Sequence, residues 1–320
     1  MSNSFLVTGA LGCIVAWTVK SLVDDGRRVV AFDLPGEPRR LRAIMTPDEL
    51  ARVTFAEGDV TSLDSIGGAL DEHGSTNVIH LAALQVPFVR AEPIRGAQVN
   101  VVGTVNVFEA VRARAERITA PIVYASSAAV FSYEDSAKVA RNEDARSLPG
   151  TLYGVFKLAN EGTARVYHQE NGIASIGLRP YTVYGPGRDQ GVTAAPTHAI
   201  AAAARGEEYH IPYGGRIFFN YAPDVARTIV QASCSRFVGQ GCFNVPGVAA
   251  HMSELVAAIE SIVPEARGTL TYDEAPLPFP EELAVGGLER AIGPLPVTPL
   301  ADAVGATVAH FRSAWIHRFA

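Results

Sequence analysis

The sequence FLVTGALGCIV, residues 5–15, places a short apolar run directly before a turn that contains two glycines. Residues 5–7 have the composition of a buried strand, and residues 16–25 have the periodicity of a helix. Between them, Gly9 and Gly12 permit a tight turn whose backbone N–H groups can approach a ligand closely. Because the positive end of the helix would lie at this turn, the segment predicts a strand–turn–helix unit that binds a pyrophosphate.

The first half of the chain repeats this alternation of strand and helix. A further helix is expected to start at Thr61, where Asp64 three residues later completes a capping box. Continuous strands that alternate with helices are typical of a Rossmann-type α/β fold, a doubly wound parallel sheet covered on both faces. Other strands are expected at residues 28–32, 52–56, 77–81, 121–125 and 173–178, and long helices at residues 98–112 and 153–170.

The pattern changes after residue 179. An alanine-rich helix is expected at residues 199–204, and six prolines in residues 273–299 indicate an irregular segment of the kind that often lines binding sites. The expected organisation is a dinucleotide-binding domain at residues 1–178 and a smaller C-terminal substrate-binding lobe at residues 179–320, of which residues 216–243 return to the first domain.

Composition narrows the class of protein. The formal net charge of −6, without a lysine- or arginine-rich cluster, argues against a nucleic-acid partner. No apolar stretch is long enough to span a membrane, and the first residues lack the features of a signal peptide. The cysteines Cys13, Cys234 and Cys242 and the eight histidines lack metal-site spacing. We therefore expect a cytoplasmic protein with reduced thiols and no metal site.

Asp33 ends the second expected strand, 21 residues after Gly12. A carboxylate there accepts hydrogen bonds from ribose hydroxyls and repels a 2′-phosphate, so NAD is favoured over NADP. Arg39 and Arg40 lie nearby and weaken that preference. Val15 stands where a third glycine is expected, and its branched side chain should push the helix slightly off the sheet.

Two further segments are expected beside the cofactor. Asp59 and Val60 could contact the adenine, although an aspartate that starts a turn is an equally good interpretation. His80 is interpreted as a hydrogen-bonded core histidine rather than a metal ligand. The residues after it leave room for the dinucleotide: Leu81, Ala82 and Ala83.

Tyr153 and Lys157 lie four residues apart in an expected helix and therefore share one face. A phenol has a pKa of about 10, which a neighbouring ammonium and a positive nicotinamide ring would lower. The phenolate could then take a proton from a substrate hydroxyl while hydride leaves the same carbon. Ser126 and Ser127 end the fifth strand, and Ser127 is the preferred partner for the substrate oxygen. Asn100 could tie the active-site helix and strand together.

These segments resemble the extended short-chain dehydrogenase/reductases of the NAD-dependent epimerase/dehydratase family. The resemblance is carried by TGALGCI, Asp33, GDV at 58–60, HLAA at 80–83, VNVVGT, YASSAAVF, YGVFK and RPYTVYGPG at 179–187. It implies bound NAD, a catalytic centre of Ser127, Tyr153 and Lys157, and a homodimer formed through the helices at residues 100–112 and 153–170. The cofactor contacts that follow are Gly9, Gly12, Cys13, Ile14, Asp33, Asp59, Val60, Leu81, Ala82, Ala83, Asn100, Tyr153, Lys157 and Pro180.

The resemblance has two departures that concern the substrate. Relatives that act on nucleotide-diphosphate sugars carry an arginine at the position of Ile217, whereas Arg216 stands one place earlier here. The loss of a bidentate arginine should weaken diphosphate binding. Thr182 replaces the asparagine that the family has after the sixth strand. In these respects the chain is similar to family dehydrogenases that act on free sugars or sugar acids.

The leading hypothesis is therefore an NAD-dependent dehydrogenase that oxidises a secondary alcohol of a sugar, sugar acid or similar polyol. A UDP-sugar 4-epimerase with tightly held NAD is the alternative, and a non-catalytic NAD(H)-binding protein is the third possibility. Contacts to this carbohydrate-like small molecule are expected from Gln85, Arg90, Ser127, Thr182, Arg188, Arg216 and Asn220.

Overall fold

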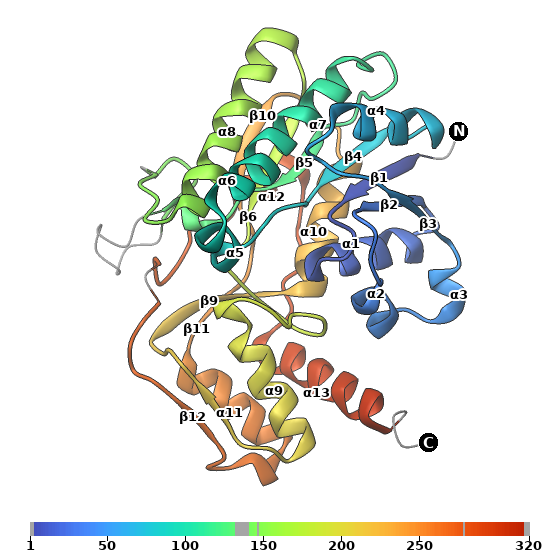
Figure 1. Ribbon diagram of the computed structural model, residues 1–320. Coiled ribbons are helices and arrows are strands. Elements are labelled where there is room, and N and C mark those ends of the chain that lie inside the picture. The colour runs from blue at the N-terminus through green and yellow to red at the C-terminus, as the bar shows by residue number, and fades with distance from the viewer. Residues whose placement is uncertain (1–2, 132–140, 146, 278, 317–320) are drawn as a thin grey trace.

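The computed structural model describes residues 3–131, 141–145, 147–277 and 279–316. A seven-stranded sheet forms the larger part, and a smaller lobe lies beyond the ends of its strands (Figure 1). All neighbouring strands are parallel, in the order β10-β6-β5-β4-β1-β2-β3, which confirms the predicted fold class. The strands are β1 (Ser4–Thr8), β2 (Arg28–Asp33), β3 (Val53–Glu57), β4 (Asn77–His80), β5 (Ile122–Ala125), β6 (Ser175–Arg179) and β10 (Gln240–Asn244).

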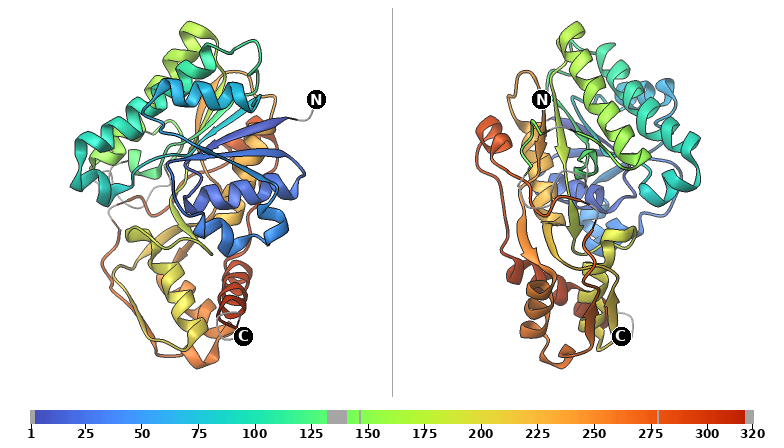
Figure 2. Two further views of the ribbon diagram at one scale, coloured as in Figure 1. Left: turned by 45° about the vertical axis from the view of Figure 1, so that its right-hand side comes forward. Right: turned by 90° about the vertical axis from the view of Figure 1, so that its left-hand side faces the viewer.

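Helices cover both faces of this sheet (Figure 2). Side chains alternate along each strand, so Phe5 and Val7 of β1 belong to one core and Leu6 to the core on the opposite face. Helices α1 (Cys13–Asp24) and α10 (Ala222–Cys234) pack together on the first face. The opposite face carries α4 (Leu63–Glu72), α7 (Gly103–Arg112) and α8 (Leu152–Asn171). Shorter helices are α2 (Arg39–Ile44), α3 (Pro47–Leu50), α5 (Val86–Ala91), α6 (Pro93–Ala97) and α12 (Gly287–Ile292).

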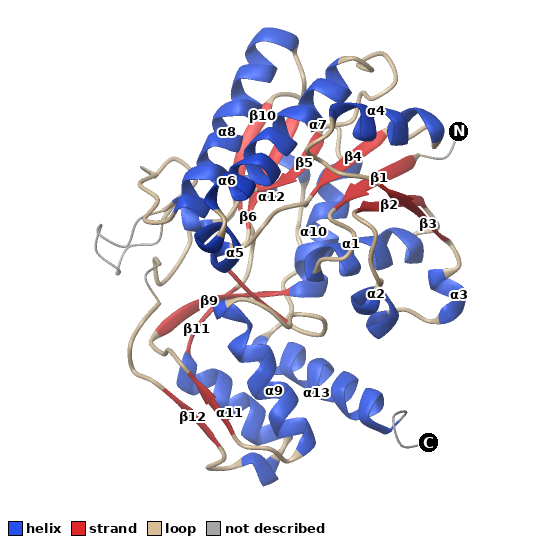
Figure 3. Cartoon of the chain, in the orientation of Figure 1, coloured by secondary structure: helices blue, strands red, loops and turns tan. Residues whose placement is uncertain are grey.

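The lobe contains two small sheets and three helices around its own apolar core (Figure 3). One sheet has the order β11-β9-β7, and the other pairs β12 with β8. No helix in the described ranges combines the length and apolar composition that a membrane span requires. The elements are β7 (Thr182–Tyr184), β8 (Tyr209–Ile211), β9 (Arg216–Tyr221), β11 (Val248–His251), β12 (Leu270–Tyr272), α9 (Ala195–Arg205), α11 (Met252–Ile262) and α13 (Leu300–Ile316).

Several predicted helix starts are wrong in detail. Helix α1 begins at Cys13 rather than at residue 16, and α9 begins at Ala195 rather than at residue 199. Helix α4 is capped by Ser62, whose hydroxyl accepts from the Ser65 amide at 3.2 Å. Thr61 lies in the preceding turn, where Asp59 accepts from the Thr61 amide through Oδ1 at 2.8 Å and from the Ser62 amide through its carbonyl at 3.0 Å. The helix expected at residues 98–112 continues directly from α6 and contains a π-helical turn, Gln98–Val102, before α7. Such turns widen a helix locally and are common near functional sites.

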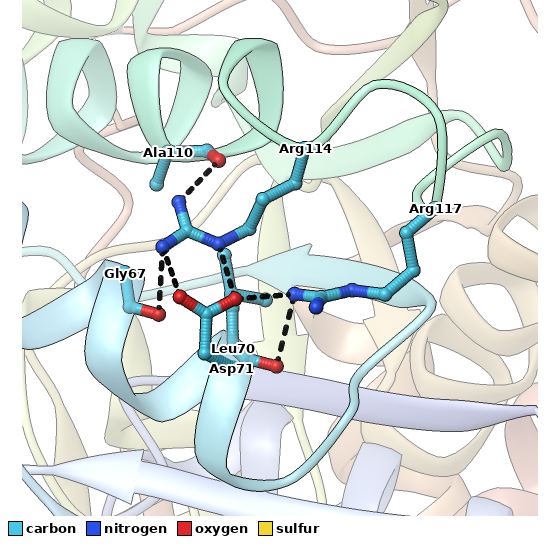
Figure 4. A network of polar contacts seen from close by, with 6 residues as sticks. All are labelled: Gly67, Leu70, Asp71, Ala110, Arg114 and Arg117. Carbon is cyan, nitrogen blue, oxygen red and sulfur yellow. Dashed lines mark hydrogen bonds and ion pairs between the residues drawn. The ribbon is translucent and has the colours of Figure 1, made fainter.

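Away from the strand ends, an arginine pair joins α4 to the turn after α7 (Figure 4). Asp71 accepts from Arg114 Nη2 at 2.6 Å and from Arg117 Nη2 at 2.9 Å. Arg114 also donates to the carbonyls of Gly67 and Ala110. The hydrogen bonds from the two guanidinium groups hold the pKa of Asp71 well below its usual value. This network fixes the helical layer that backs the strands on which the site is built.

Candidate active site

A cavity of about 630 Å³ lies where the carboxyl ends of the sheet strands face the lobe. Asp33 and Gly58 line one end of it, and Tyr153 and Lys157 line the other together with Phe279 of the lobe. The carboxyl ends of parallel strands are where open α/β sheets place their ligands.

The turn after β1 is shaped for close approach of a ligand. Gly9 has φ +81°, and a Cβ added there would lie 2.7 Å from the backbone N and Cα of Ala82, so a side chain does not fit. The Gly12 amide donates to the Gly9 carbonyl at 2.9 Å, and α1 starts at Cys13. Val15 is 3% exposed and fills the core beside α10. The turn therefore brings the amino end of α1 to the cavity wall, as a pyrophosphate requires.

Asp33 is held in place at its end of the cavity. Its Oδ2 accepts from the Leu11 amide and its Oδ1 from the Leu34 amide, both at 2.8 Å. Arg40 donates to the Leu11 carbonyl at 2.5 Å and to Asp189 Oδ1 at 2.6 Å. Because Asp189 engages Arg40, the guanidinium does not offset the negative charge that Asp33 presents to a 2′-phosphate.

Ser127, Tyr153 and Lys157 meet at the other end of the cavity. Lys157 Nζ donates to the Ala125 carbonyl at 2.7 Å and lies 5.6 Å from the centre of the Tyr153 ring. The Ser127 hydroxyl interacts with the Tyr153 phenol. Gly154 makes this packing possible, because a Cβ there would collide with the Ala129 carbonyl. The strand end and the first turn of α8 thus bring a hydroxyl, a phenol and an ammonium together.

The electrostatics of this centre differ from the expectation that the ammonium lowers the phenol pKa. Burial raises the pKa of Tyr153, while the Ser127 hydrogen bond and the charge of Arg188 oppose that rise. Burial lowers the pKa of Lys157 to about 8. Removal from water disfavours the charged form of both groups, and this effect prevails in the protein without bound cofactor.

A buried ion pair supports the centre from behind. Arg179, at the end of β6, donates to Glu161 Oε1 and Oε2 of α8 at 2.7 Å each. Ser126 donates to the same carboxylate at 2.5 Å, which leaves Ser127 as the hydroxyl that faces Tyr153. The Arg179 and Glu161 side chains are 5% and 9% exposed. The pair therefore ties β5, β6 and α8 together next to the site.

His80 and Asn100 have structural partners. The His80 ring nitrogens contact the hydroxyls of Thr8 at 2.8 Å and Thr104 at 3.0 Å, and burial lowers the pKa of the imidazole to about 3. This is the hydrogen-bonded core histidine that the sequence indicates. The Asn100 amide exchanges two hydrogen bonds with the Leu84 backbone, at 2.7 and 2.9 Å. Over the described parts of the chain, no group of three or more side chains could hold a metal.

The cavity gathers most residues that were expected to contact the cofactor or substrate. The cofactor candidates that line it are Gly9, Gly12, Cys13, Ile14, Asp33, Asp59, Val60, Leu81, Ala82, Ala83, Tyr153, Lys157 and Pro180. The substrate candidates that line it are Gln85, Arg90, Ser127, Thr182 and Arg188.

Three expected contacts lie outside the cavity lining and must be corrected. The Asn100 amide is used by Leu84, as described above. Arg216 points to solvent, 3.9 Å from Glu282. Asn220 is fully buried, and its side chain accepts from the Tyr181 amide at 2.7 Å and donates to the Pro246 carbonyl at 2.8 Å. The Asn100 and Asn220 amides are satisfied by the protein backbone and Arg216 is exposed to solvent, which a motif position does not reveal.

Several lining residues were not singled out in the sequence, although the proline-rich segment was expected to be of the kind that lines binding sites. Asp189 and Thr193 lie in the loop after β7, and Leu277 and Phe279 come from the proline-rich segment. The bridge from Asp189 to Arg40 joins residues far apart in the chain, so only the fold could reveal it.

Two relatives are similar in sequence to this chain, one over almost its whole length and one over little more than half of it. The UDP-glucose 4-epimerase of Mycolicibacterium smegmatis is 29% identical over 96% of this chain and 98% of its own. UDP-glucuronate 4-epimerase 1 of Arabidopsis thaliana is 30% identical over 57% of this chain. That match covers 43% of the plant protein, so the chain spans less than half the length of this longer relative.

A solved structure is also similar. The UDP-glucose 4-epimerase of Thermus thermophilus, in complex with NAD, is 25% identical with a TM-score of 0.79, over 97% of this chain and 99% of its own. The model of the NAD dependent epimerase/dehydratase family matches residues 5–245, most of the chain and all seven strands of the large sheet. The chain therefore belongs to the NAD dependent epimerase/dehydratase family, as its motifs indicate.

Proposed function

We propose that this protein is an NAD-dependent dehydrogenase that oxidises a secondary alcohol of a small polyhydroxylated substrate, such as a sugar or sugar acid. The observation that carries the proposal is the place of Ile217. It is fully buried in the apolar core of the lobe, where it pairs with Ala250 of β11. Position 217 therefore offers no charge to a diphosphate, whose recognition favours a bidentate arginine.

The segments that line the cavity support a small substrate. Its lining ends in the loop after β7, at Thr193, and resumes only at Leu277 and Phe279. Among the described residues, none between 194 and 276 lines it. Most of the lobe, which would have to hold a nucleotide, is thus turned away from the cavity.

The residues fit NAD, which supplies the hydride acceptor when it is bound. The Gly9 turn and the start of α1 would hold the pyrophosphate, because no Cβ obstructs the backbone there. Asp33 would accept from the adenosine ribose, and Lys157 would hold the nicotinamide ribose. Asp59 and Val60, which line the same cavity, would contact the adenine.

Tyr153 acts as the general base in this proposal. Ser127 orients the substrate hydroxyl. The phenolate of Tyr153 takes the proton of that hydroxyl as hydride leaves the carbon that bears it. Since burial raises the pKa of the phenol, ionisation depends on positive charge nearby. Arg188 supplies part of that charge, and the oxidised nicotinamide ring would act in the same direction when NAD is bound.

A UDP-sugar 4-epimerase is the second candidate, because relatives with that activity align over almost the whole chain. The third candidate, a non-catalytic NAD(H)-binding protein, is disfavoured because Tyr153 and Lys157 are both present and face the cavity.

A substrate panel distinguishes these functions. The purified protein is incubated with NAD and, separately, with free sugars, sugar acids and UDP-sugars, while NADH absorbance and product stereochemistry are recorded. We expect NADH to accumulate in proportion to a free sugar or sugar acid consumed. Inversion of a UDP-sugar without net NADH would contradict the dehydrogenase proposal and favour the epimerase.

A dehydrogenase must release NADH in each turnover, and the bridge between Arg40 and Asp189 lies at the cavity lining beside the Gly9 turn. Asp189→Asn should therefore raise the NADH dissociation rate. The expected rise is only about two- to fivefold, because a partly exposed ion pair contributes little free energy. Stopped-flow fluorescence of NADH displacement measures that rate. Asp24→Asn breaks the surface pair with Lys20 instead and should leave the rate unchanged. Equal rates in all three proteins would exclude the bridge as a barrier to exchange.

We also propose that the protein forms a homodimer through α7 and α8. We further propose that it works in the cytoplasm. Apolar side chains stand exposed on α8, at Val155 (44%) and Val166 (39%), and on the helical segment that leads into α7, at Ile94 (79%) and Val102 (46%). The three free cysteines suit a reducing compartment. Analytical ultracentrifugation tests the dimer.

A further inference from the structure

Arg40 lies beside the carboxylate that is expected to bind the adenosine ribose. Its Nη1 donates to the Leu11 carbonyl at 2.5 Å, while the Leu11 amide donates to Asp33 Oδ2 at 2.8 Å. The guanidinium group and the carboxylate are therefore bonded to the backbone of the same residue. Leu11, Asp33 and Arg40 all line the cavity, so a positive charge borders the end at which the ribose would lie.

A single carboxylate from a distant part of the chain holds Arg40 and its neighbour Arg39. Asp189 Oδ1 accepts from Arg40 Nε at 2.9 Å and from Arg40 Nη2 at 2.6 Å. Its Oδ2 accepts from Arg39 Nη2 at 3.2 Å. Together with the bond to Leu11, these contacts engage all three nitrogens of the Arg40 guanidinium group. Asp189 therefore occupies the donors that Arg40 could offer to a ligand.

The charge of Asp189 also opposes that of Arg40 at the turn after β1. Cys13, the first residue of α1, lines the cavity there. Burial raises the pKa of the Cys13 thiol to about 11, the charges of Arg188 and Arg40 lower it, and the charge of Asp189 raises it. Asp189 thus offsets the positive charge of Arg40 at a point where the cofactor would bind.

The ribose 2′-phosphate is the group that distinguishes NADP from NAD. In dinucleotide-binding folds an aspartate at the end of the second strand suits the free ribose, whereas an arginine nearby accommodates the phosphate. This chain contains both, because Asp33 ends β2 and Arg40 is bonded to the same residue as Asp33. A guanidinium group binds phosphate oxygens through paired, charge-assisted hydrogen bonds, so Arg40 would suit the phosphate if it were released from Asp189.

We infer that Arg40, assisted by Arg39, forms a latent site for a ribose 2′-phosphate, and that Asp189 keeps this site closed. Asp189 is thus a second residue that determines cofactor specificity, although it lies far from β2 in the chain. Asp33 excludes the phosphate by repulsion, whereas Asp189 excludes it by engaging the groups that would bind it. The inference concerns the cofactor alone and does not depend on which substrate is oxidised.

The test measures the dissociation constants of NADH and NADPH by fluorescence titration, without substrate. We expect the wild-type protein to bind NADH more tightly than NADPH. Asp189→Asn should improve the affinity for NADPH relative to that for NADH about 5- to 20-fold, because the guanidinium groups become available to the phosphate. Combined with Asp33→Ser, which removes the repulsion, the improvement over wild type should reach about 50- to 500-fold.

Three further variants locate the effect. Adding Arg40→Gln to Asp189→Asn should abolish most of the gain in relative NADPH affinity. Adding Arg39→Gln instead should abolish less of it, because Arg39 does not line the cavity. Glu37→Gln is a matched control, since it breaks an ion pair of 2.6 Å with Arg42, which also lies outside the cavity lining. It should leave the ratio of the two dissociation constants unchanged.

An unchanged ratio in Asp189→Asn would overturn the inference, and so would a gain that persists in full after Arg40→Gln is added. A wild-type protein that prefers NADPH would overturn it too, because the site would then be open. The variants should fold, since the side chains of Arg40 and Asp189 are 14% and 41% exposed. Failure of the proposed dehydrogenase function would be seen separately, as inversion of a UDP-sugar without net NADH, and would leave this ratio unaffected.

Discussion

Tyr153→Phe should lower turnover about 10²- to 10⁴-fold, the usual contribution of a general acid or base, with little change in NAD affinity. The phenol lies within reach of Ser127 and of the cavity that holds the proposed substrate. Phenylalanine preserves the ring that Lys157 approaches at 5.6 Å, so the packing of α8 should persist. The variant removes the proton acceptor and leaves the pyrophosphate turn intact.

Steady-state kinetics with the substrate from the panel and NAD titration by fluorescence test this expectation. Tyr167→Phe is a matched control, because its hydroxyl bonds to Glu109 at 2.6 Å and does not line the cavity. It should keep wild-type turnover. Turnover of Tyr153→Phe close to that of wild type would remove the tyrosine from the mechanism.

Arg179→Met should lower the free energy of unfolding by about 3–5 kcal/mol, the usual cost of leaving one partner of a buried ion pair uncompensated. The side chains of Arg179 and Glu161 are 5% and 9% exposed, so water cannot replace the lost guanidinium. The Arg179 Nη1 bond to the Glu143 carbonyl at 2.9 Å is lost as well. Because Ser126 shares the Glu161 carboxylate, the end of β5 should loosen too.

Urea denaturation of three variants isolates the cause. The double variant Glu161→Met with Arg179→Met contains no uncompensated charge and should recover much of the lost stability. Arg112→Met breaks an exposed pair with Glu109 and should cost no more than about 1 kcal/mol. If Arg179→Met and Arg112→Met were equally stable, the buried pair would not support the site.

The parts of the fold and site that the sequence predicted are encoded locally. Gly9 and Gly12 act within one turn, and Tyr153 and Lys157 share a face because one helical turn separates them. The alternation of strand and helix was enough to predict the parallel sheet, because a βαβ connection leaves few topologies.

The parts that could not be predicted depend on contacts between distant segments. Asn220 looks like a substrate ligand in its motif, yet packing brings the Pro246 carbonyl to its amide. Ser62 rather than Thr61 caps α4, because Asp59 forms a turn that contains Thr61 and the helix starts one residue later than expected.

The most direct measurement of the proposed chemistry follows a deuterium label from the reacting carbon of the identified substrate. The account predicts that the label leaves with free NADH, one equivalent for each substrate oxidised, and that the carbon product is a ketone. Recovery of the label in an inverted alcohol, with the nucleotide still oxidised and bound, would contradict it.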